Sequence, residues 1–190
     1  MQRAYKCLSR QEFTNGNYRL IPIRDEDKYV IMQWRNEQID ILRQKEPLTK
    51  EAQERYFKNI VDKLFEQQQP DQLLFSFLEN DILIGYGGLV HIDWESRNGE
   101  VSFITKSKRN ENKKLFIMDF GIFLEIILSV AFDFLKFIKV HTTFYDIKER
   151  ETYKEVITKF NFIPDAKSKN HALVSEKFEK VFIYARFNKS

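Results

Sequence analysis

The chain has 190 residues and, with 31 Lys and Arg against 28 Asp and Glu, a formal net charge of +3 at pH 7. This length suits one domain, or one domain with a short extension. The small net charge argues against the dense basic stripe of a nucleic-acid-binding protein, so we expect no nucleic-acid partner. Cys7 is the only cysteine, which excludes an internal disulfide. His91, His141 and His171 lack metal-ligand spacing, so we expect no metal.

The N-terminal segment is interpreted as an extension. Residues 1–17 are polar and aperiodic, and they end in the turn signal Asn15-Gly16-Asn17. We expect them to be docked on the domain or partly free, and we expect residues 18–190 to form a single domain. The first residues lack a long apolar core, so they do not resemble a signal peptide.

A strand and two helices come next in chain order. Residues 18–24 alternate between apolar and polar side chains and predict a strand, in which Pro22 favours an edge position. Asp25 is expected to cap a helix over residues 26–41, and a second amphipathic helix is predicted over residues 50–68. The inner faces expected for these helices consist of Tyr29, Met32, Ile39 and Leu42, and of Tyr56, Ile60, Val61, Leu64 and Phe65.

Three antiparallel strands follow. Residues 73–78 and 82–92 predict two strands joined by the tight hairpin Glu79-Asn80-Asp81. The glycines inside the second of these strands indicate a bend, or a place where another group approaches the backbone closely. After a further turn, residues 99–106 are predicted to return as the next strand.

A long apolar helix is predicted over residues 115–137. The stretch 115–135 is nearly long enough to span a membrane, but it contains Asp119, Glu125 and Asp133. Each of these carboxylates would cost about 2.5–3.5 kcal/mol at the centre of a bilayer. We therefore expect a buried helix, no membrane partner and a cytoplasmic protein.

The remaining pattern predicts a strand over 139–146, a short helix over 151–160, the start of a strand at 162–164 and a last strand over 177–187. The long helix and its two flanking strands form one βαβ unit, which requires two parallel strands. The remaining strands form antiparallel hairpins, so the chain falls in the α/β (α+β) class with a mixed sheet.

A candidate anion site lies in the βαβ unit, where a strand leads through a basic loop to a helix N-terminus. Free backbone N–H groups and the positive end of the helix dipole meet at such a point. The cations around it are Lys106, Lys108, Arg109, Lys113 and Lys114. The pattern suggests a phosphorylated cofactor; the alternative is a solvated charged loop.

The order of elements and several short motifs resemble the GNAT superfamily of acyl-CoA-dependent N-acetyltransferases. YRLIPIRDEDKYVIMQWRNEQ is similar to the opening of GNAT branches that modify ribosomal protein termini, antibiotics or nucleotide-linked amino sugars. The hairpin of these branches resembles LLFSFLENDILIGYGGLVHID. The end of their cofactor helix, together with the next strand, resembles IILSVAFDFLKFIKVHTTFYD, and the helix that follows resembles ETYKEVITKFNFIP. The resemblance covers residues 18–187 and implies a mixed, mostly antiparallel sheet of about seven strands with about four helices.

The resemblance also implies where acetyl-CoA and the catalytic base lie. Glu100 corresponds to a base that acts directly or through water; the alternative is an ordinary carboxylate at a strand end. Backbone atoms of residues 103–105 are expected to hydrogen-bond the pantetheine arm, since the family separates two strands there. The residues assigned to the cofactor are Phe103, Ile104, Thr105, Lys108, Arg109, Lys113 and Lys114.

The acceptor is expected beside the first helices and one strand of the hairpin. Trp34, Arg35 and Asn36 occur where the family borders its acceptor cleft; the alternative is a core Trp34 and a structural ion pair for Arg35. His91 and Asp93 share one face of a strand by its two-residue period, and they either line the amine pocket or form a surface pair.

Two positions depart from the family pattern. The stretch KRNENKKLFIMDFG has no glycine before Gly121, whereas the family loop uses glycines to bring backbone amides close to the pyrophosphate. The tyrosine that often protonates the departing thiolate corresponds to Ile157. Tyr153, one helical turn earlier, is the candidate replacement; the alternative for it is a packing role.

The function that the resemblance implies is transfer of an acetyl group from acetyl-CoA to a primary amine by direct attack. The acceptor is a small molecule, with an amino sugar as one class, or a protein N-terminus. A catalytically inactive GNAT-fold module that binds CoA or acts as a scaffold is the alternative. The sequence leaves the acceptor, the acyl length and the oligomeric state open, including a homodimer.

Overall fold

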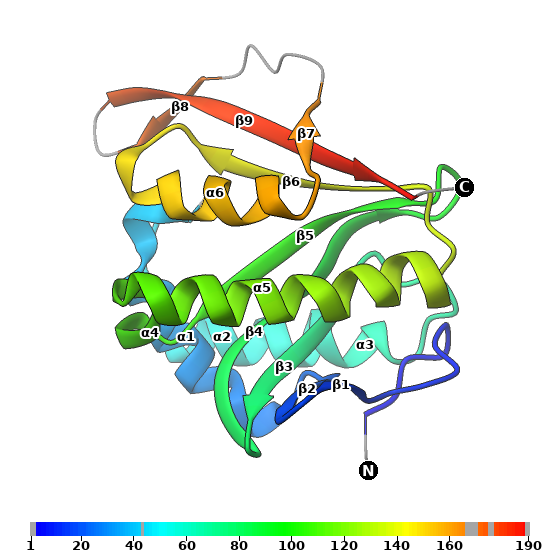
Figure 1. Ribbon diagram of the computed structural model, residues 1–190. Coiled ribbons are helices and arrows are strands. Elements are labelled where there is room, and N and C mark those ends of the chain that lie inside the picture. Colours follow the sequence, from blue (N-terminus) through cyan, green and yellow to red (C-terminus); the bar gives the residue numbers. More distant parts are fainter. Residues whose placement is uncertain (1–2, 43, 166–170, 175–176, 189–190) are drawn as a thin grey trace.

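A mixed β-sheet lies between two layers of helices in the computed structural model, which describes residues 3–42, 44–165, 171–174 and 177–188 (Figure 1). The strand order is β1-β2-β3-β4-β5-β6-β9-β7, and β8 also pairs with β9. All neighbouring strands are antiparallel except β5 and β6. The strands are β1 (Phe13–Asn15), β2 (Tyr18–Pro22), β3 (Leu73–Glu79), β4 (Ile82–Asp93), β5 (Asn98–Thr105), β6 (Lys139–Tyr145), β7 (Ile163–Pro164), β8 (His171–Val174) and β9 (Lys177–Phe187).

Helices cover both faces of the sheet (Figure 1). α5 and α6 lie on the near face in this view, and α1, α2 and α3 lie behind the sheet. The helices are α1 (Lys28–Glu37), α2 (Lys50–Tyr56), α3 (Asp62–Leu64), α4 (Ser107–Glu111), α5 (Lys113–Ser129) and α6 (Glu151–Lys159). Short 3-10 turns occupy Asp25–Asp27, Ile39–Ile41 and Lys148–Arg150, and π-helical turns occupy Phe57–Val61 and Val130–Phe134.

The predicted fold class is confirmed, with more elements than expected. β1 and β8 are strands that the sequence pattern did not separate from their surroundings, because each has only three or four residues. α4 forms where a basic loop was predicted. The predicted helix over 50–68 is α2 and α3 joined by a π-helical turn.

The predicted inner faces of the first two helices are partly wrong. α1 buries Ile31 and Trp34, whereas Tyr29 is 37% exposed. The π-helical turn Phe57–Val61 buries Phe57 and Val61, and α3 buries Leu64, whereas Tyr56 and Ile60 are exposed. The pairs Tyr56-Phe57 and Ile60-Val61 each place two apolar residues side by side in the sequence. Periodicity alone therefore left the rotation of that helix undecided.

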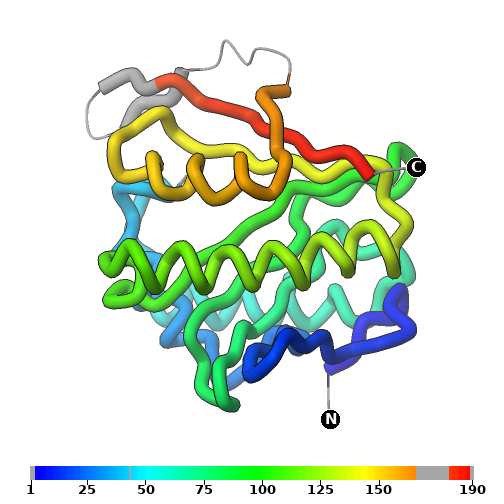
Figure 2. Tube along the Cα trace, in the orientation of Figure 1, coloured from blue at the N-terminus to red at the C-terminus, as the bar shows by residue number. Residues whose placement is uncertain are grey.

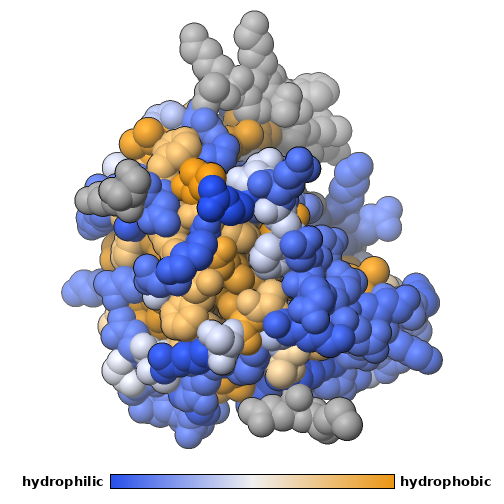
Figure 3. All heavy atoms as spheres, turned by 90° about the vertical axis from the view of Figure 1, so that its right-hand side faces the viewer, coloured by the Kyte–Doolittle hydropathy of each residue, from blue (hydrophilic) through white to orange (hydrophobic). Residues whose placement is uncertain are grey.

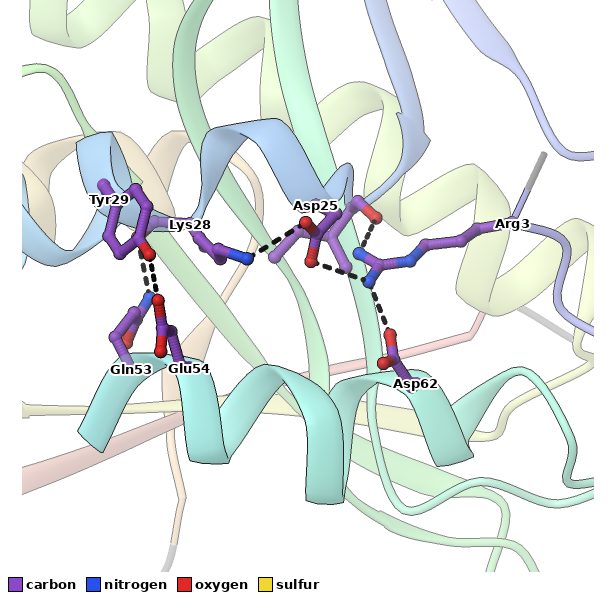
Figure 4. Close-up of polar contacts among 8 residues, drawn as sticks. Arg3, Asp25, Lys28, Tyr29, Gln53, Glu54 and Asp62 are labelled. Atoms are coloured by element: carbon purple, nitrogen blue, oxygen red, sulfur yellow. Dashed lines mark hydrogen bonds and ion pairs between the residues drawn. The ribbon is translucent and has the colours of Figure 1, made fainter. Parts of the chain in front are cut away.

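The N-terminal segment packs against the domain through a buried tyrosine and an arginine. Tyr5 is 1% exposed, and its hydroxyl donates to the carbonyl of Leu74 at 2.7 Å while accepting from the Leu74 amide at 2.8 Å. Arg3 contacts the Ile23 carbonyl, Asp25 and Asp62 (Figure 4). Asp25 is thus paired with Arg3 and Lys28 and does not cap α1 as predicted. The domain boundary at residue 17 stays a prediction.

α5 is the central helix of the core. With the π-helical turn that follows, it is long and apolar enough to cross a membrane, yet most of its side chains pack inside this fold. Phe103 of β5 lies between Phe120 and Phe123 of α5, at ring-centroid distances of 5.0 and 4.6 Å. A Cβ at Gly87 would come within 2.8 Å of Phe123, so the absence of a side chain there lets α5 approach the sheet.

One carboxylate on the buried face of α5 is neutralised by a bidentate ion pair. Asp119 is 0% exposed, and it accepts from Nε and Nη2 of Arg109 at 2.6 and 2.7 Å. The Nη1 atom of Arg109 lies 3.0 Å from Glu79 at the end of β3. Arg109, predicted to bind a cofactor phosphate, therefore fixes α4 to α5 and β3 through contacts that occupy all three of its nitrogens.

Removal of this arginine should destabilise the fold strongly. Arg109→Met leaves Asp119 buried without a counter-charge, and we expect a loss of about 3–5 kcal/mol in the free energy of unfolding, measured by urea denaturation. Arg109→Met/Asp119→Leu should recover most of that loss, because it removes both charges. Lys114→Met, on the exposed face of α5, is the control. A single variant that unfolds at the wild-type midpoint would contradict this account.

Candidate active site

The site is built where the two parallel strands β5 and β6 separate. Their register holds only three pairs, Asn98 with Lys139, Gly99 with Val140 and Glu100 with His141. Beyond the third pair the two strands diverge, as the tube trace shows (Figure 2). A cavity of about 380 Å³ lies at the divergence, lined on the two strands by residues 101–104 and 142–145.

Each diverging strand keeps its other neighbour. β5 remains paired with β4 up to Thr105, and β6 remains paired with β9 up to Tyr145. The opening therefore exposes one strand edge on each side without loosening the rest of the sheet. Backbone N–H and C=O groups on these two edges have no ladder partner, and an extended ligand with amide groups can hydrogen-bond them.

Two of the three backbone positions predicted for the cofactor line this cavity. Phe103 and Ile104 do so, with the Phe103 side chain packed in the core behind them. Thr105 does not, because its carbonyl accepts from Nε2 of Gln38 at 2.8 Å and its hydroxyl donates to the Ile84 carbonyl. The sequence did not predict this role of Gln38, because a buried glutamine that hydrogen-bonds a distant strand has the same local sequence pattern as a glutamine on the surface.

The predicted anion site at the N-terminus of α5 is filled by the chain itself. The Asn112 side chain caps the helix and accepts from the amides of Lys114 and Leu115 at 3.1 and 3.2 Å. Lys113 pairs with Glu155 of α6 at 3.3 Å. Lys106, Lys108 and Lys114 are exposed and form no ion pair within the described residues, so these three predicted cations remain available for an anion.

Glu100 lies at the last paired position of β5, between two histidines. It is 5% exposed, and its Oε2 atom is 3.8 Å from Nε2 of His91 and 4.0 Å from Nε2 of His141. Glu100 and His91 both line the cavity. His141 was not predicted as a site residue because it lies on a strand forty residues further along the chain, and only the parallel register brings it beside Glu100.

His91 and Asp93, predicted to share one face of a strand, are both exposed but have different partners. The register between β4 and β5 shifts between Val90 and Asp93, and His91 has a φ of +50°. This bulge breaks the two-residue period from which a shared face was inferred. His91 turns to Glu100, whereas Asp93 accepts from the Ser96 amide at 2.9 Å and closes the next turn.

The three α1 residues predicted for the acceptor divide into three roles. Trp34 is 5% exposed and belongs to the core. Asn36 bonds the amide and the carbonyl of Leu48 and shapes the following loop. Arg35 alone reaches the cavity, and it also lines an adjoining pocket of about 260 Å³.

Sequence and structure comparisons place this architecture in a family. Residues 20–143 match the family described as "Acetyltransferase (GNAT) domain", which is more than half of the chain. The chain belongs to the GNAT acetyltransferase family. No curated protein matches the chain in sequence.

Several solved GNAT structures share the fold. A spermidine N-acetyltransferase from Vibrio cholerae in complex with CoA and spermine is 15% identical with a TM-score of 0.73, over 91% of this chain and 96% of that one. The ribosomal-protein-S5-alanine acetyltransferase from Vibrio fischeri is 13% identical with a TM-score of 0.72, over 94% and 97%. A dodecameric structure of the Vibrio cholerae spermidine enzyme is 17% identical with a TM-score of 0.71, over 91% and 95%.

Ile157 and Tyr153, the two positions considered for the tyrosine of the GNAT pattern, have different surroundings. Ile157 is 0% exposed and packs in the core. Tyr153 lines the cavity, and its hydroxyl lies 2.5 Å from the hydroxyl of Thr142 on β6. The Tyr153 ring stacks on Phe120, and the guanidinium of Arg150 lies 4.9 Å from its centroid.

Cys7 is remote from this chemistry. It does not line the cavity, and burial raises the pKa of its thiol to about 11, so the thiol is protonated near neutral pH. A protonated thiol is a poor nucleophile.

His141 should make the stability of the fold depend on pH. Burial lowers the pKa of His141, and the nearby Glu100 only partly opposes this. As pH falls below about 6.5, the unfolded chain binds a proton that the folded one does not, so stability is lost. We expect His141→Gln to reduce the fall in melting temperature between about pH 7 and pH 5. Thr143→Gln, which removes no titratable group, is the control; an unchanged fall in the His141 variant would refute the assignment.

Proposed function

We propose that this GNAT chain is an acetyl-CoA-dependent N-acetyltransferase that acts on a primary amine of a small molecule or on a protein N-terminus. The divergence of β5 and β6 beyond the Glu100–His141 pair carries this proposal. The resulting cavity combines free strand edges for an extended thioester with a buried carboxylate for the amine. The solved Vibrio cholerae enzyme with the same fold, in complex with CoA and spermine, supports it.

Acetyl-CoA supplies the activated acyl group, and the chain supplies orientation and proton transfer. The free edge of β5 around Phe103 and Ile104 binds the amide-bearing arm, and an N–H group on that edge polarises the acyl carbonyl. Lys108 and Lys114 contact the phosphates at the open end. Two of the four cations predicted to bind the cofactor are left out, because Arg109 is paired with Asp119 and Lys113 is paired with Glu155.

Glu100 prepares the acceptor for attack. A protonated amine has no lone pair, so a base must remove its proton before or during attack. Glu100 accepts that proton directly or through water. His91 and His141, both within about 4 Å of its Oε2 atom, then lead the proton toward solvent at the exposed His91.

Two measurements test the proposal in sequence. Calorimetric titration with acetyl-CoA should show binding, and a thiol-release assay over an amine library should identify an acceptor. Binding without thiol release from any amine would instead favour the inactive GNAT-fold module. The cytoplasmic location and a homodimer stay predictions. Figure 3 shows that apolar side chains reach the surface on the face drawn there, and Phe134, Ile138 and Phe187 are among the exposed large apolar residues of the chain.

Loss of the base should slow turnover without loss of cofactor binding. Glu100→Gln keeps the shape of the side chain but accepts no proton, and we expect kcat to fall by about 10²–10⁴-fold. Acetyl-CoA affinity, measured by titration, should stay within twofold of wild type. Glu95→Gln, in the exposed turn before β5, is the matched control. Full turnover in the Glu100 variant would reduce this residue to a structural role.

Tyr153 is proposed to protonate the departing thiolate. Tyr153→Phe should lower kcat and remove the alkaline limb of the pH–rate profile, because the acid is then lost. Tyr184→Phe, a buried tyrosine on β9 outside the cavity, is the control. An unchanged profile would mean that solvent supplies the proton, as a thiol pKa of about 8.5 allows.

A further inference from the structure

We propose that the acceptor amine also carries an oxyanion, a carboxylate or a phosphate, and that Arg35 binds it. The inference rests on the proposed function, because it specifies the acceptor of the same cavity. Arg35 lines both the cavity between the strands and the adjoining pocket, which also share Gln72, Val90 and Ser102. The two spaces therefore meet at this guanidinium.

Within the described residues, the guanidinium of Arg35 has neutral partners only. Its Nε atom donates to Gln44 Oε1 at 2.9 Å, and its Nη1 atom donates to the Tyr86 hydroxyl at 2.7 Å. Across the part of the chain that the structure describes, no carboxylate forms an ion pair with it. Of the five N–H donors of an arginine, these two bonds use two. The rest lie on the two Nη atoms, the edge that binds a carboxylate or phosphate with two parallel hydrogen bonds.

The surroundings make the missing counter-charge significant. Arg35 is half-buried, and the adjoining pocket is lined by apolar side chains that include Ile31, Phe57 and Leu74. A cation away from water is costly unless it is paired. Arg109 shows the contrast, because the chain supplies its carboxylate partner, Asp119. At Arg35 the ligand would supply it.

Arg35 is also held in place before any ligand binds. Gln44, which accepts from Arg35, donates to Asn36 Oδ1 at 3.0 Å. Asn36 in turn accepts from the Leu48 amide at 2.8 Å and donates to the Leu48 carbonyl at 2.9 Å. This chain of bonds limits the motion of a side chain that is otherwise flexible, which lowers the entropy cost of binding an anion.

The charge pattern of the cavity suits a molecule with both signs of charge. Glu100 and Arg35 line the same cavity, so an amine near Glu100 can place an oxyanion near Arg35. Arg150 adds a second positive side chain to the lining. A polyamine such as spermidine, the acceptor named for the Vibrio cholerae enzyme, would bring further positive charge toward these arginines. We therefore expect this chain to discriminate against polyamines.

The experiment compares matched ligands on the CoA-saturated protein. Calorimetric titrations use amino acids against their carboxamides, phosphoethanolamine against ethanolamine, and spermidine. We expect an oxyanion-bearing member to bind at least about tenfold more tightly than its neutral match, since a charge-assisted pair is lost in the latter. The carboxylate and phosphate arms distinguish the two sources of the oxyanion.

Variants assign the effect to Arg35. Arg35→Gln should abolish the preference while acetyl-CoA affinity stays unchanged, and Arg35→Lys should retain part of it because the charge remains without the fork. Arg55→Gln, an exposed arginine on α2, is the control. If Arg35→Gln fails to fold, the wild-type ligand pairs and Arg35→Lys still decide the question.

The possible outcomes distinguish failure of this inference from failure of the proposed acetyltransferase function. Equal binding of acids and carboxamides, or a preference that survives Arg35→Gln, overturns the inference. Thiol release from spermidine or neutral amines that is equal in the wild type and in Arg35→Gln supports the acetyltransferase proposal. The same result overturns the inference that the acceptor carries an oxyanion bound by Arg35. Arg35-dependent binding of oxyanions without thiol release from any amine supports the inference and overturns the proposed catalysis.

Discussion

The candidate site depends on the short parallel pairing of β5 and β6. Three pairs hold the strands together, and the divergence beyond Glu100 and His141 creates the cavity. The opening is stable because each strand keeps an antiparallel neighbour on its other side. The same last pair sets Glu100 beside His141, so one feature of strand register supplies both the cavity proposed for a thioester and the environment of the proposed base.

Basic side chains serve different purposes in this molecule, and their partners distinguish them. Arg109 has two carboxylate partners and stabilises the position of α5. Among the residues that the structure describes, Arg35 has only neutral partners, although it is half-buried beside an apolar pocket. Lys108 and Lys114 are exposed to solvent. An arginine in a basic loop before a helix therefore does not by itself indicate phosphate binding, because carboxylates of the chain can already be paired with it.

The loop between β5 and α5 shows how this chain departs from the glycine-rich family pattern. Without glycines, the segment folds into the short helix α4, and Asn112 takes the first free amides of α5. Backbone amides that would otherwise contact a pyrophosphate are therefore partly satisfied within the chain. Binding of a phosphorylated cofactor would depend more on lysine side chains, whose contacts are sensitive to salt.

The sequence alone determined the fold class, the βαβ unit and the placement of Glu100 at the start of β5. These follow from local periodicity, since strands and long helices differ in the spacing of their apolar residues. Only the tertiary structure decided which charges are free. In the folded chain, Arg109 pairs with Asp119, His91 and Asp93 have different partners at a β-bulge, and His141 lies beside Glu100. Such contacts join residues far apart in the chain, and a local pattern carries no information about them.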